Sequence, residues 1–279
     1  MMANKPTTAA GYPPEMAIAA RQMCLYVATI LGDLLDDIVV VGGLVPYLIV
    51  DQMHGVEGHV GTRDLDLGLA LAVLDEERYK QIADRLRARG FTQAMNEDGT
   101  PTRQTWKLRE EAITIDFLIP PAGASQKPGK LQNLQADFAA IITPALPLAF
   151  QDVVRVVIDD TTPNRERAKR QVNVAGPAAF VVLKAHALKQ RGENKDAYDL
   201  VYVLRSFGDE PITEVVRRFA TIASATEAVE ALTILDAEFA SVEHVGPRRY
   251  AEFLGDANDA ERRAEAFAAV REFLRLLHP

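Results

Sequence analysis

Residues 61–66 read Gly-Thr-Arg-Asp-Leu-Asp, and they come after the run Ile-Val-Val-Val-Gly-Gly at residues 38–43. The β-branched run predicts a strand that ends at the glycine pair, after which the chain can resume as a helix. Residues 64–72 alternate leucine with polar or small residues, which predicts a second strand. Because side chains alternate faces along a strand, Asp64 and Asp66 project from the same side, while the leucines face the core.

A third carboxylate interrupts the strongly apolar run Ile-Thr-Ile-Asp-Phe-Leu at residues 113–118. A lone aspartate in such a strand is costly to bury without a partner. Placed beside Asp64 and Asp66 in one sheet, Asp116 would complete a group of three carboxylates, and like charges this close require a cation. Carboxylate oxygens suit Mg²⁺ or Mn²⁺, which support in-line displacement at phosphorus. The pattern therefore predicts a divalent metal site.

The glycine pair Gly42-Gly43 supplies a second requirement of this chemistry, since it lets the backbone approach a phosphate closely. The N-terminus of the helix that follows directs free amides toward negative charge. Taken alone, such a pair is more often a tight turn, and no GxGxxG spacing follows it. Asp64 and Asp66 could likewise be ordinary strand-end carboxylates. The presence of Thr62 and of the third aspartate favours the metal and phosphate interpretation.

The remaining sequence predicts an α+β protein in which a mixed region is followed by an all-helical one. Helical patterns occupy residues 14–35, 44–53 and 75–89, strand patterns occupy 91–95, 104–108, 112–119, 153–158 and 171–174, and residues 123–134 have the composition of a loop. Pro177 is well placed as a first helical residue, and the later sequence is rich in Ala, Glu, Leu and Arg. We therefore expect an α/β domain over residues 1–175 and a helical domain over residues 176–279.

Composition excludes several classes of protein. The chain has 279 residues, of which 48% are hydrophobic and 25% charged, as in an ordinary globular protein. Its single cysteine, Cys24, excludes an internal disulfide, and the histidines show no spacing typical of zinc sites. The longest apolar stretch, residues 38–50, is shorter than the roughly 20 residues needed to cross a bilayer. The first 14 residues contain no apolar signal segment, so we expect a cytoplasmic protein.

The formal net charge of −8 limits contact with nucleic acid to a local basic patch. The best candidate is the basic run Arg165, Arg167, Lys169 and Arg170, which we place on a hairpin or connecting loop between two strands. Such a run is more often a solvated loop, and its alternative role is to grip an RNA backbone.

Three of these features, in this order, resemble the first three motifs of the DNA polymerase beta-like nucleotidyltransferase superfamily. They are the Val-Gly-Gly of residues 41–43, the Thr-x-Asp-x-Asp of residues 62–66, and Asp116 in its apolar strand. The resemblance implies a nucleotidyltransferase-like mixed sheet with flanking helices, followed by the all-helical region. It also implies an enzyme that transfers a nucleoside monophosphate from a nucleoside triphosphate (NTP) to an acceptor.

Residues 183–200, LKAHALKQRGENKDAYDL, are similar to the fourth motif of the AbiEii-type branch of that superfamily. The resemblance implies that Lys184 contacts the nucleotide phosphates and that Asp196 and Asp199 support the site from the helical domain. Members of this branch are often toxins of bacterial toxin–antitoxin pairs, and some add nucleotides to the acceptor ends of transfer RNA. RNA, the tRNA 3′ end in particular, is therefore the expected acceptor, and a cognate antitoxin is a candidate partner.

These features together define a predicted site. Its catalytic residues are Asp64, Asp66, Asp116, Lys184 and Asp199. Its nucleotide-binding residues are Gly42, Gly43, Thr62, Lys184 and Asp196. The three carboxylates hold the metal, and Asp116 also helps to activate the acceptor hydroxyl that attacks the α-phosphorus and releases pyrophosphate. From the residues alone, Lys184 could instead be a surface lysine, and Asp196 and Asp199 could be first-turn carboxylates of a helix.

Alternatives stay open on the acceptor and on catalysis itself. A small molecule or a protein side chain could replace RNA as the acceptor. The chain could also be a non-catalytic module that keeps a nucleotide pocket, or its helices over residues 212–277 could form an adaptor for a partner protein.

Two stretches have no assigned role. Residues 44–61 include His54, Glu57 and His59 and could form a loop over the site, whereas residues 121–150, with Lys127 and Lys130, match no motif.

Overall fold

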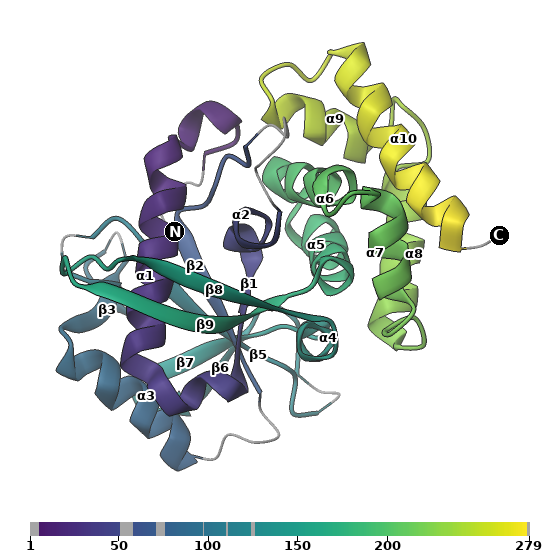
Figure 1. Ribbon diagram of the computed structural model, residues 1–279. Helices are drawn as coiled ribbons and strands as arrows, with labels where there is room; N and C mark the ends of the chain where they lie inside the picture. The colour runs from purple at the N-terminus through teal and green to yellow at the C-terminus, as the bar shows by residue number, and fades with distance from the viewer. Residues whose placement is uncertain are drawn as a thin grey trace.

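The strands of the protein form one mixed sheet (Figure 1). The computed structural model describes residues 6–50, 58–70, 76–96, 98–109, 111–123 and 126–277. Within these ranges the strands are β1 (Ile38–Val41), β2 (Asp64–Leu69), β3 (Phe91–Met95), β4 (Pro101–Leu108), β5 (Thr114–Ile119), β6 (Leu131–Gln135), β7 (Phe138–Ile142), β8 (Val153–Thr161) and β9 (Arg167–Ala175). Their order is β3-β4-β5-β2-β1-β9-β8, with β7 beside β5 and β6 beside β7. The three strands expected to carry the site are therefore adjacent.

The pairing register places the predicted site residues side by side. β2 runs antiparallel to β1, with Asp66 opposite Val41, and parallel to β5, with Asp66 opposite Asp116. Asp64 lies two residues earlier in β2 and thus on the same face. The chain leaves β1 at Gly42, so the glycine pair lies at the end of β1 that is next to Asp66.

Helices cover both faces of the sheet. On one face, α1 (Pro14–Leu31) packs against β9, β8 and β2, and α3 (Glu76–Ala88) packs against α1 and β3. On the other face, α4 (Leu146–Gln151) lies against Gly68, since a Cβ at Gly68 would come within 2.5 Å of Leu146 Cδ1. The short helix α2 (Val45–Ile49) follows the glycine pair. Because Gly68 shares its strand face with Asp66, the carboxylates lie on the α4 side of the sheet.

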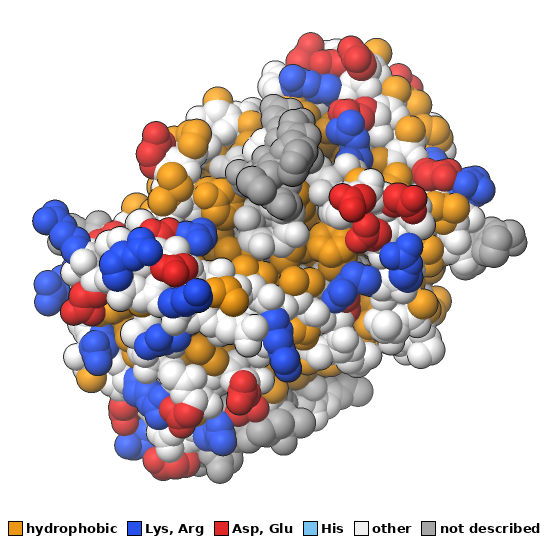
Figure 2. All heavy atoms as spheres, in the orientation of Figure 1, with side chains coloured by type: hydrophobic (Ala, Val, Ile, Leu, Met, Phe, Trp, Pro, Cys, Tyr) orange, Lys and Arg blue, Asp and Glu red, His pale blue; other side chains and the backbone are white. Residues whose placement is uncertain are grey.

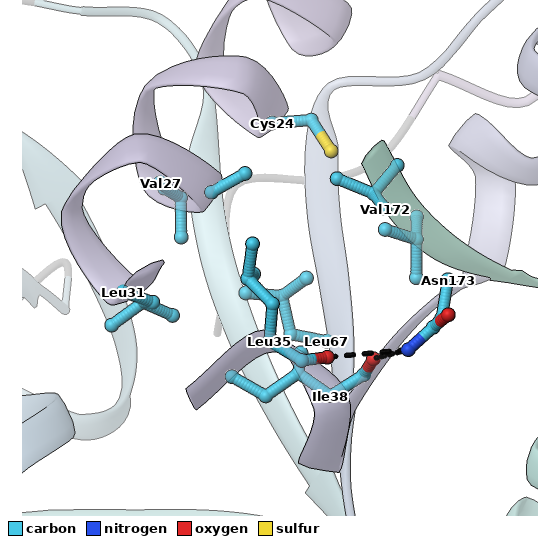
Figure 3. Close-up of a pocket in the computed structure, with 10 residues that line it drawn as sticks. Cys24, Val27, Leu31, Leu35, Ile38, Leu67, Val172 and Asn173 are labelled. Atoms are coloured by element: carbon cyan, nitrogen blue, oxygen red, sulfur yellow. Dashed lines mark hydrogen bonds between the residues drawn. The ribbon is translucent and has the colours of Figure 1, made fainter. Parts of the chain in front are cut away.

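Helix α1 is part of the core. By length and composition, the segment Pro14–Asp37 alone among the described residues could cross a membrane, but 56% of its apolar window is buried inside the protein. A narrow cavity between α1 and the sheet is lined mainly by apolar side chains, and Asn173 donates from Nδ2 to the carbonyls of Leu35 and Ile38 beside it (Figure 3). Burial raises the pKa of the Cys24 thiol in this lining to about 12. The cavity therefore belongs to the core and offers no site for an ionic substrate.

From Pro177 onward the described chain forms helices and turns. The helices are α5 (Pro177–Arg191), α6 (Asn194–Ser206), α7 (Pro211–Phe219), α8 (Thr226–Glu238), α9 (Val245–Phe253) and α10 (Ala260–Leu277). The buried residue Asp152 joins them to the sheet: its Oδ2 accepts a hydrogen bond from the Ala179 N–H at 2.9 Å, and its Oδ1 accepts one from Arg218 Nε at 2.7 Å. This contact fixes the start of α5, the helix that carries Lys184.

The hairpin β8–β9 closes one side of the sheet and carries the basic run. Arg165 lies in its turn, and Arg167, Lys169 and Arg170 lie on β9, all of them exposed. Figure 2 shows Lys and Arg side chains gathered over the end of this hairpin that is far from the C-terminal helices. Asp159 on β8 offsets part of this charge through ion pairs with Arg167 and Lys169. The predicted hairpin is confirmed, but strand β9 begins earlier than predicted, so most of the basic run lies on the strand and not on a connecting loop.

The predicted α+β class is also confirmed, and Pro177 does begin a helix. The predicted boundary between residues 175 and 176 falls between the last strand and α5, but the division into two domains stays a prediction. The helix predicted over residues 14–35 ends at Leu31, because Gly32 takes a φ of +55° and the chain tightens into a 3₁₀ helix, Gly32–Asp37.

One prediction of secondary structure was wrong. The loop predicted over residues 123–134 includes most of strand β6, and the sheet continues into β7. The side chains of β6 are half-buried or exposed, and leucine there alternates with glutamine and asparagine, so this edge strand lacks a strong apolar pattern. Residues 51–53 of the helix predicted over 44–53 lie outside the described residues, as do His54 and Glu57.

Candidate active site

Three carboxylates meet on the centre of the sheet. Asp64, Asp66 and Asp116 each offer an oxygen, and these oxygens all lie within 4.8 Å of one another. Asp64 and Asp116 are buried and Asp66 is half-buried. The parallel register of β2 and β5 produces this meeting, because it sets Asp66 directly beside Asp116 and leaves Asp64 on the same face. The predicted convergence of these side chains is confirmed.

Two threonine hydroxyls orient the carboxylates. Thr62 Oγ1 donates to Asp64 Oδ1 at 2.7 Å, and Thr105 Oγ1 donates to Asp116 Oδ1 at 2.6 Å. Each hydroxyl therefore fixes one oxygen of its partner and sets the direction of the other. Thr62 belongs to the predicted motif, but Thr105 was missed. Its role depends on the antiparallel register of β4 and β5, which places Thr105 opposite Asp116.

Both glycines of the pair are required by close contacts. Gly42 has a φ of +70°, and a Cβ there would lie 1.8 Å from Asp66 Oδ2. A Cβ at Gly43 would lie 2.7 Å from Thr62 Oγ1 and 3.3 Å from the Nζ atom of Lys195. A side chain at either position would therefore collide with the carboxylate site. The backbone at this corner borders the site directly, as a phosphate cradle needs.

Helices α5 and α6 contribute a network of ion pairs in which four members are buried and Arg191 is exposed. Lys184 Nζ lies 2.9 Å from Asp196 Oδ1 and 2.6 Å from Asp199 Oδ2. Arg191 donates from Nε and a terminal nitrogen to the two oxygens of Asp196, each at 2.7 Å. Lys195 Nζ donates to Asp199 Oδ1 at 2.6 Å. The fourth motif is thus a single cluster of alternating charges.

The pKa values of this network follow from its pairing. Burial opposes the charge of Lys184, but the carboxylates of Asp196 and Asp199 outweigh it and hold the Lys184 pKa above its usual range. Burial likewise opposes the charge of Asp199, but Lys184 and Lys195 outweigh it and hold the Asp199 pKa well below its usual range. For Lys195 the balance is reversed: burial lowers its pKa, and the Asp199 charge restores it only in part.

His59 ties this network to the strand that carries the aspartates. Its Nε2 lies 2.9 Å from Asp199 Oδ1, and its Nδ1 accepts a hydrogen bond from the Gly61 N–H at 3.0 Å. Burial lowers the pKa of His59 to about 4, so the ring is neutral near pH 7, with Nε2 as the donor to Asp199. The ring also stacks on Tyr198, with centroids 5.2 Å apart. His59 therefore lies buried against α6, and the predicted loop over the site does not include it.

The glycine corner, two of the aspartates and the helical network line one pocket. Its lining residues are Tyr12, Gly42, Gly43, Thr62, Arg63, Asp64, Asp66, Lys184, Arg191, Glu193, Lys195, Asp196 and Asp199. Eight of the predicted site residues are in this lining, and the ninth, Asp116, lies beside Asp66. The other five lining residues had no role assigned from the sequence: Tyr12, Arg63, Arg191, Glu193 and Lys195. A pocket with carboxylates on one side and basic groups on the other can hold a cation and a polyanion together.

A mixed sheet that brings three carboxylates beside a glycine corner, with basic side chains across the pocket, is the arrangement expected of a nucleotidyltransferase. The particular family follows from comparison with known proteins. Residues 53–275 match the family described as "Nucleotidyl transferase AbiEii toxin, Type IV TA system", and the chain belongs to this family. No curated protein shows a significant match to the chain. The protein is therefore a nucleotidyltransferase of a toxin–antitoxin family, and this membership implies an NTP substrate, a divalent metal and an antitoxin partner.

Proposed function

We propose that the protein transfers a nucleoside monophosphate from an NTP to RNA, specifically to the 3′ end of tRNA, in a reaction that depends on Mg²⁺ or Mn²⁺. The observation that carries the proposal is the meeting of Asp64, Asp66 and Asp116 within 4.8 Å beside the glycine corner. In this proposal the enzyme acts in the cytoplasm as the toxin of a pair, and an antitoxin protein opposes it.

The donor set fits a divalent metal. All three side chains offer hard carboxylate oxygens, which are the ligands that Mg²⁺ prefers. Thr62 and Thr105 each engage one oxygen of a carboxylate and so orient the groups before any ligand binds. When bound, a divalent cation supplies charge neutralisation for the carboxylates and the phosphate oxygens.

Side chains and backbone groups of the protein would bind the phosphates, accept the proton and position the reacting groups. Gly42 and Gly43 admit the phosphates close to the backbone, and Lys184 contacts them from α5. The acceptor hydroxyl oxygen bonds to the α-phosphorus, the bond from that phosphorus to the bridging oxygen breaks, and pyrophosphate leaves. Asp116 accepts the hydroxyl proton. Asp196 and Asp199 hold Lys184 in place, so most of the acceleration comes from positioning and charge.

The proposed RNA acceptor is supported by the hairpin β8–β9. Its exposed basic residues are Arg155, Arg165, Arg167, Lys169 and Arg170, in a chain whose net charge is −8. The register pairs Arg155 with Asn173 and Val40 with Val174, so Arg155 shares the sheet face of Val41 and Asp66. An RNA strand lying on this face would meet positive charge on the same side of the sheet as the carboxylates.

Incubation with each α-labelled NTP, Mg²⁺ and total cellular RNA tests the proposal. Label in the tRNA fraction at its 3′ end is the expected result. Label on protein or on small molecules in a parallel cell extract would assign a different acceptor, and NTP binding without any transfer would indicate a non-catalytic module. The same assay with an added antitoxin candidate from the neighbouring gene tests the toxin role, because a true antitoxin should lower transfer or reverse its effect.

A further inference from the structure

Lys195 is the pocket cation that lies nearest Gly43, the second glycine of the corner. Its Nζ lies 3.3 Å from the position that a Cβ on Gly43 would take, and Thr62 Oγ1 lies 2.7 Å from that same position. Thr62 in turn donates to Asp64. Gly43, Thr62 and Lys195 therefore meet at one point on the border of the carboxylate site.

The side chain of Lys195 is held in this place from two sides. Asp199 accepts a hydrogen bond from its Nζ at 2.6 Å, one turn further along α6. The Tyr12 ring lies under the ammonium, with 5.4 Å from Nζ to the ring centroid. The lysine side chain is only 10% exposed, and it lines the pocket. A cation fixed in this way loses little conformational entropy when an anion binds.

The two pocket lysines differ in how well their charge is satisfied. Lys184 has carboxylate oxygens of two aspartates at 2.9 and 2.6 Å, and its pKa is raised, because those carboxylates outweigh its burial. Lys195 has the Asp199 carboxylate at 2.6 Å, and burial lowers its pKa although the charges of Asp199 and Asp64 raise it. An anion in the pocket therefore relieves the cost of burying charge at Lys195 more than at Lys184.

We propose that Lys195 is a second phosphate-binding lysine, which contacts the triphosphate where it lies on the Gly42-Gly43 corner, while Asp199 positions it. This inference rests on the proposed function, since it assumes that a polyphosphate occupies the pocket. It assigns to α6 a direct contact with the substrate, in addition to the contact proposed for Lys184 on α5.

Calorimetric titration with tripolyphosphate and Mg²⁺ tests this role without knowledge of the preferred base. Lys195→Gln removes the charge but keeps a donor for Asp199, and we expect a loss of about 10- to 100-fold in affinity for tripolyphosphate. Lys189→Gln is the matched control: that lysine is 64% exposed on α5, and its loss should leave the affinity unchanged.

The outcomes separate this inference from the proposed function. Wild-type affinity for tripolyphosphate in Lys195→Gln would overturn the inference alone. Failure of the wild-type protein to bind either tripolyphosphate or any NTP would overturn both. If Lys195→Gln does not fold, a crystal structure of the wild-type protein with Mg²⁺ and tripolyphosphate decides the matter. Lys195 Nζ within about 3.2 Å of a phosphate oxygen would support the contact, and an ammonium turned away from the phosphates would exclude it.

Discussion

The sheet side and the helix side of the pocket differ in the charges that they bring together. On the sheet, Asp64, Asp66 and Asp116 bring like charges within 4.8 Å, and neutral threonine hydroxyls orient them. On the helices, Lys184 and Asp199 belong to a buried network in which opposite charges alternate. Like charges held this close cost stability and favour a bound cation, whereas the opposite charges of the helix side attract one another. The sheet side should therefore govern turnover, and the helix side should govern both stability and the placement of cations.

The largest expected effect comes from the sheet side. Asp66→Asn should lower transfer of labelled nucleotide by about a thousandfold or more, because it removes a proposed metal ligand. Without metal, thermal unfolding should stay at the wild-type temperature or rise, since one of three like charges is gone.

The matched control for this change is Asp236→Asn, because the Asp236 side chain is 68% exposed on α8 and should affect neither quantity. Wild-type turnover in Asp66→Asn would contradict the assignment of the carboxylate site. A large loss of stability in Asp66→Asn would show instead that the three carboxylates stabilise the fold. The sheet side would then not differ from the helix side in this respect.

The next effect lies on the helix side. Asp199→Ala should lower the free energy of unfolding by about 3 to 5 kcal/mol, because it leaves Lys184 and Lys195 buried with a shared partner missing. Denaturant titration measures this change. Asp84→Ala, which breaks an exposed pair with Lys80 on α3, is the control and should be nearly silent. Equal effects of the two variants would mean that the buried network does not stabilise the fold.

Lowering the pH should reduce the free energy of unfolding through His59, which contacts the helix side of the pocket. The pKa of His59 is lowered by burial to about 4 from 6.5, so between these pH values the unfolded chain binds a proton that the native ring does not. The stability that neutral His59 contributes is complete above about pH 6.5 and is lost as the pH falls toward 4, by up to about 3 kcal/mol. Asp199, whose pKa is held well below its usual range, extends the loss to still lower pH.

Denaturant titrations at pH 7 and pH 5 measure how much the free energy of unfolding falls between these pH values. His59→Gln removes the titrating ring and should flatten the decline between the two pH values, even if it lowers stability at pH 7. His244→Gln changes an exposed histidine and should leave the decline as it is. An unchanged slope in His59→Gln would show that other groups cause the loss in acid.

The parts of the site that could be predicted from the sequence are those that depend on short spacing. Asp64 and Asp66 share a face because strand side chains alternate, and Gly42-Gly43 follows a β-branched run. For Asp116, the sequence shows only that an aspartate interrupts an apolar strand. Its position beside Asp66 comes from the strand register, which a single sequence does not fix.

The rest depended on contacts between distant segments. His59 and Asp199 are 140 residues apart in sequence, and Thr105 reaches Asp116 only through the register of β4 and β5. Lys195 resembles any surface lysine near a helix start until the fold buries it against Asp199. The missed strand β6 shows the same limit, since an edge strand needs its neighbour β7 to become a strand.

The smallest effect we predict concerns the contact through which Asp152 joins the sheet to the C-terminal helices. Asp152 accepts hydrogen bonds from the Ala179 N–H and from Arg218, and Gly176 packs against its carboxylate, where a Cβ would come within 2.3 Å of Oδ1. Asp152→Ala should lower the free energy of unfolding by about 2 kcal/mol, as expected when a buried helix-start donor loses its acceptor. Asp152→Asn keeps an acceptor for Ala179 and should lose less.

Because α5 carries Lys184, the alanine variant should also raise the KM for NTP, while the affinity for metal at the three carboxylates stays unchanged. A fall in metal affinity would instead show that the sheet side depends on the helices for its geometry.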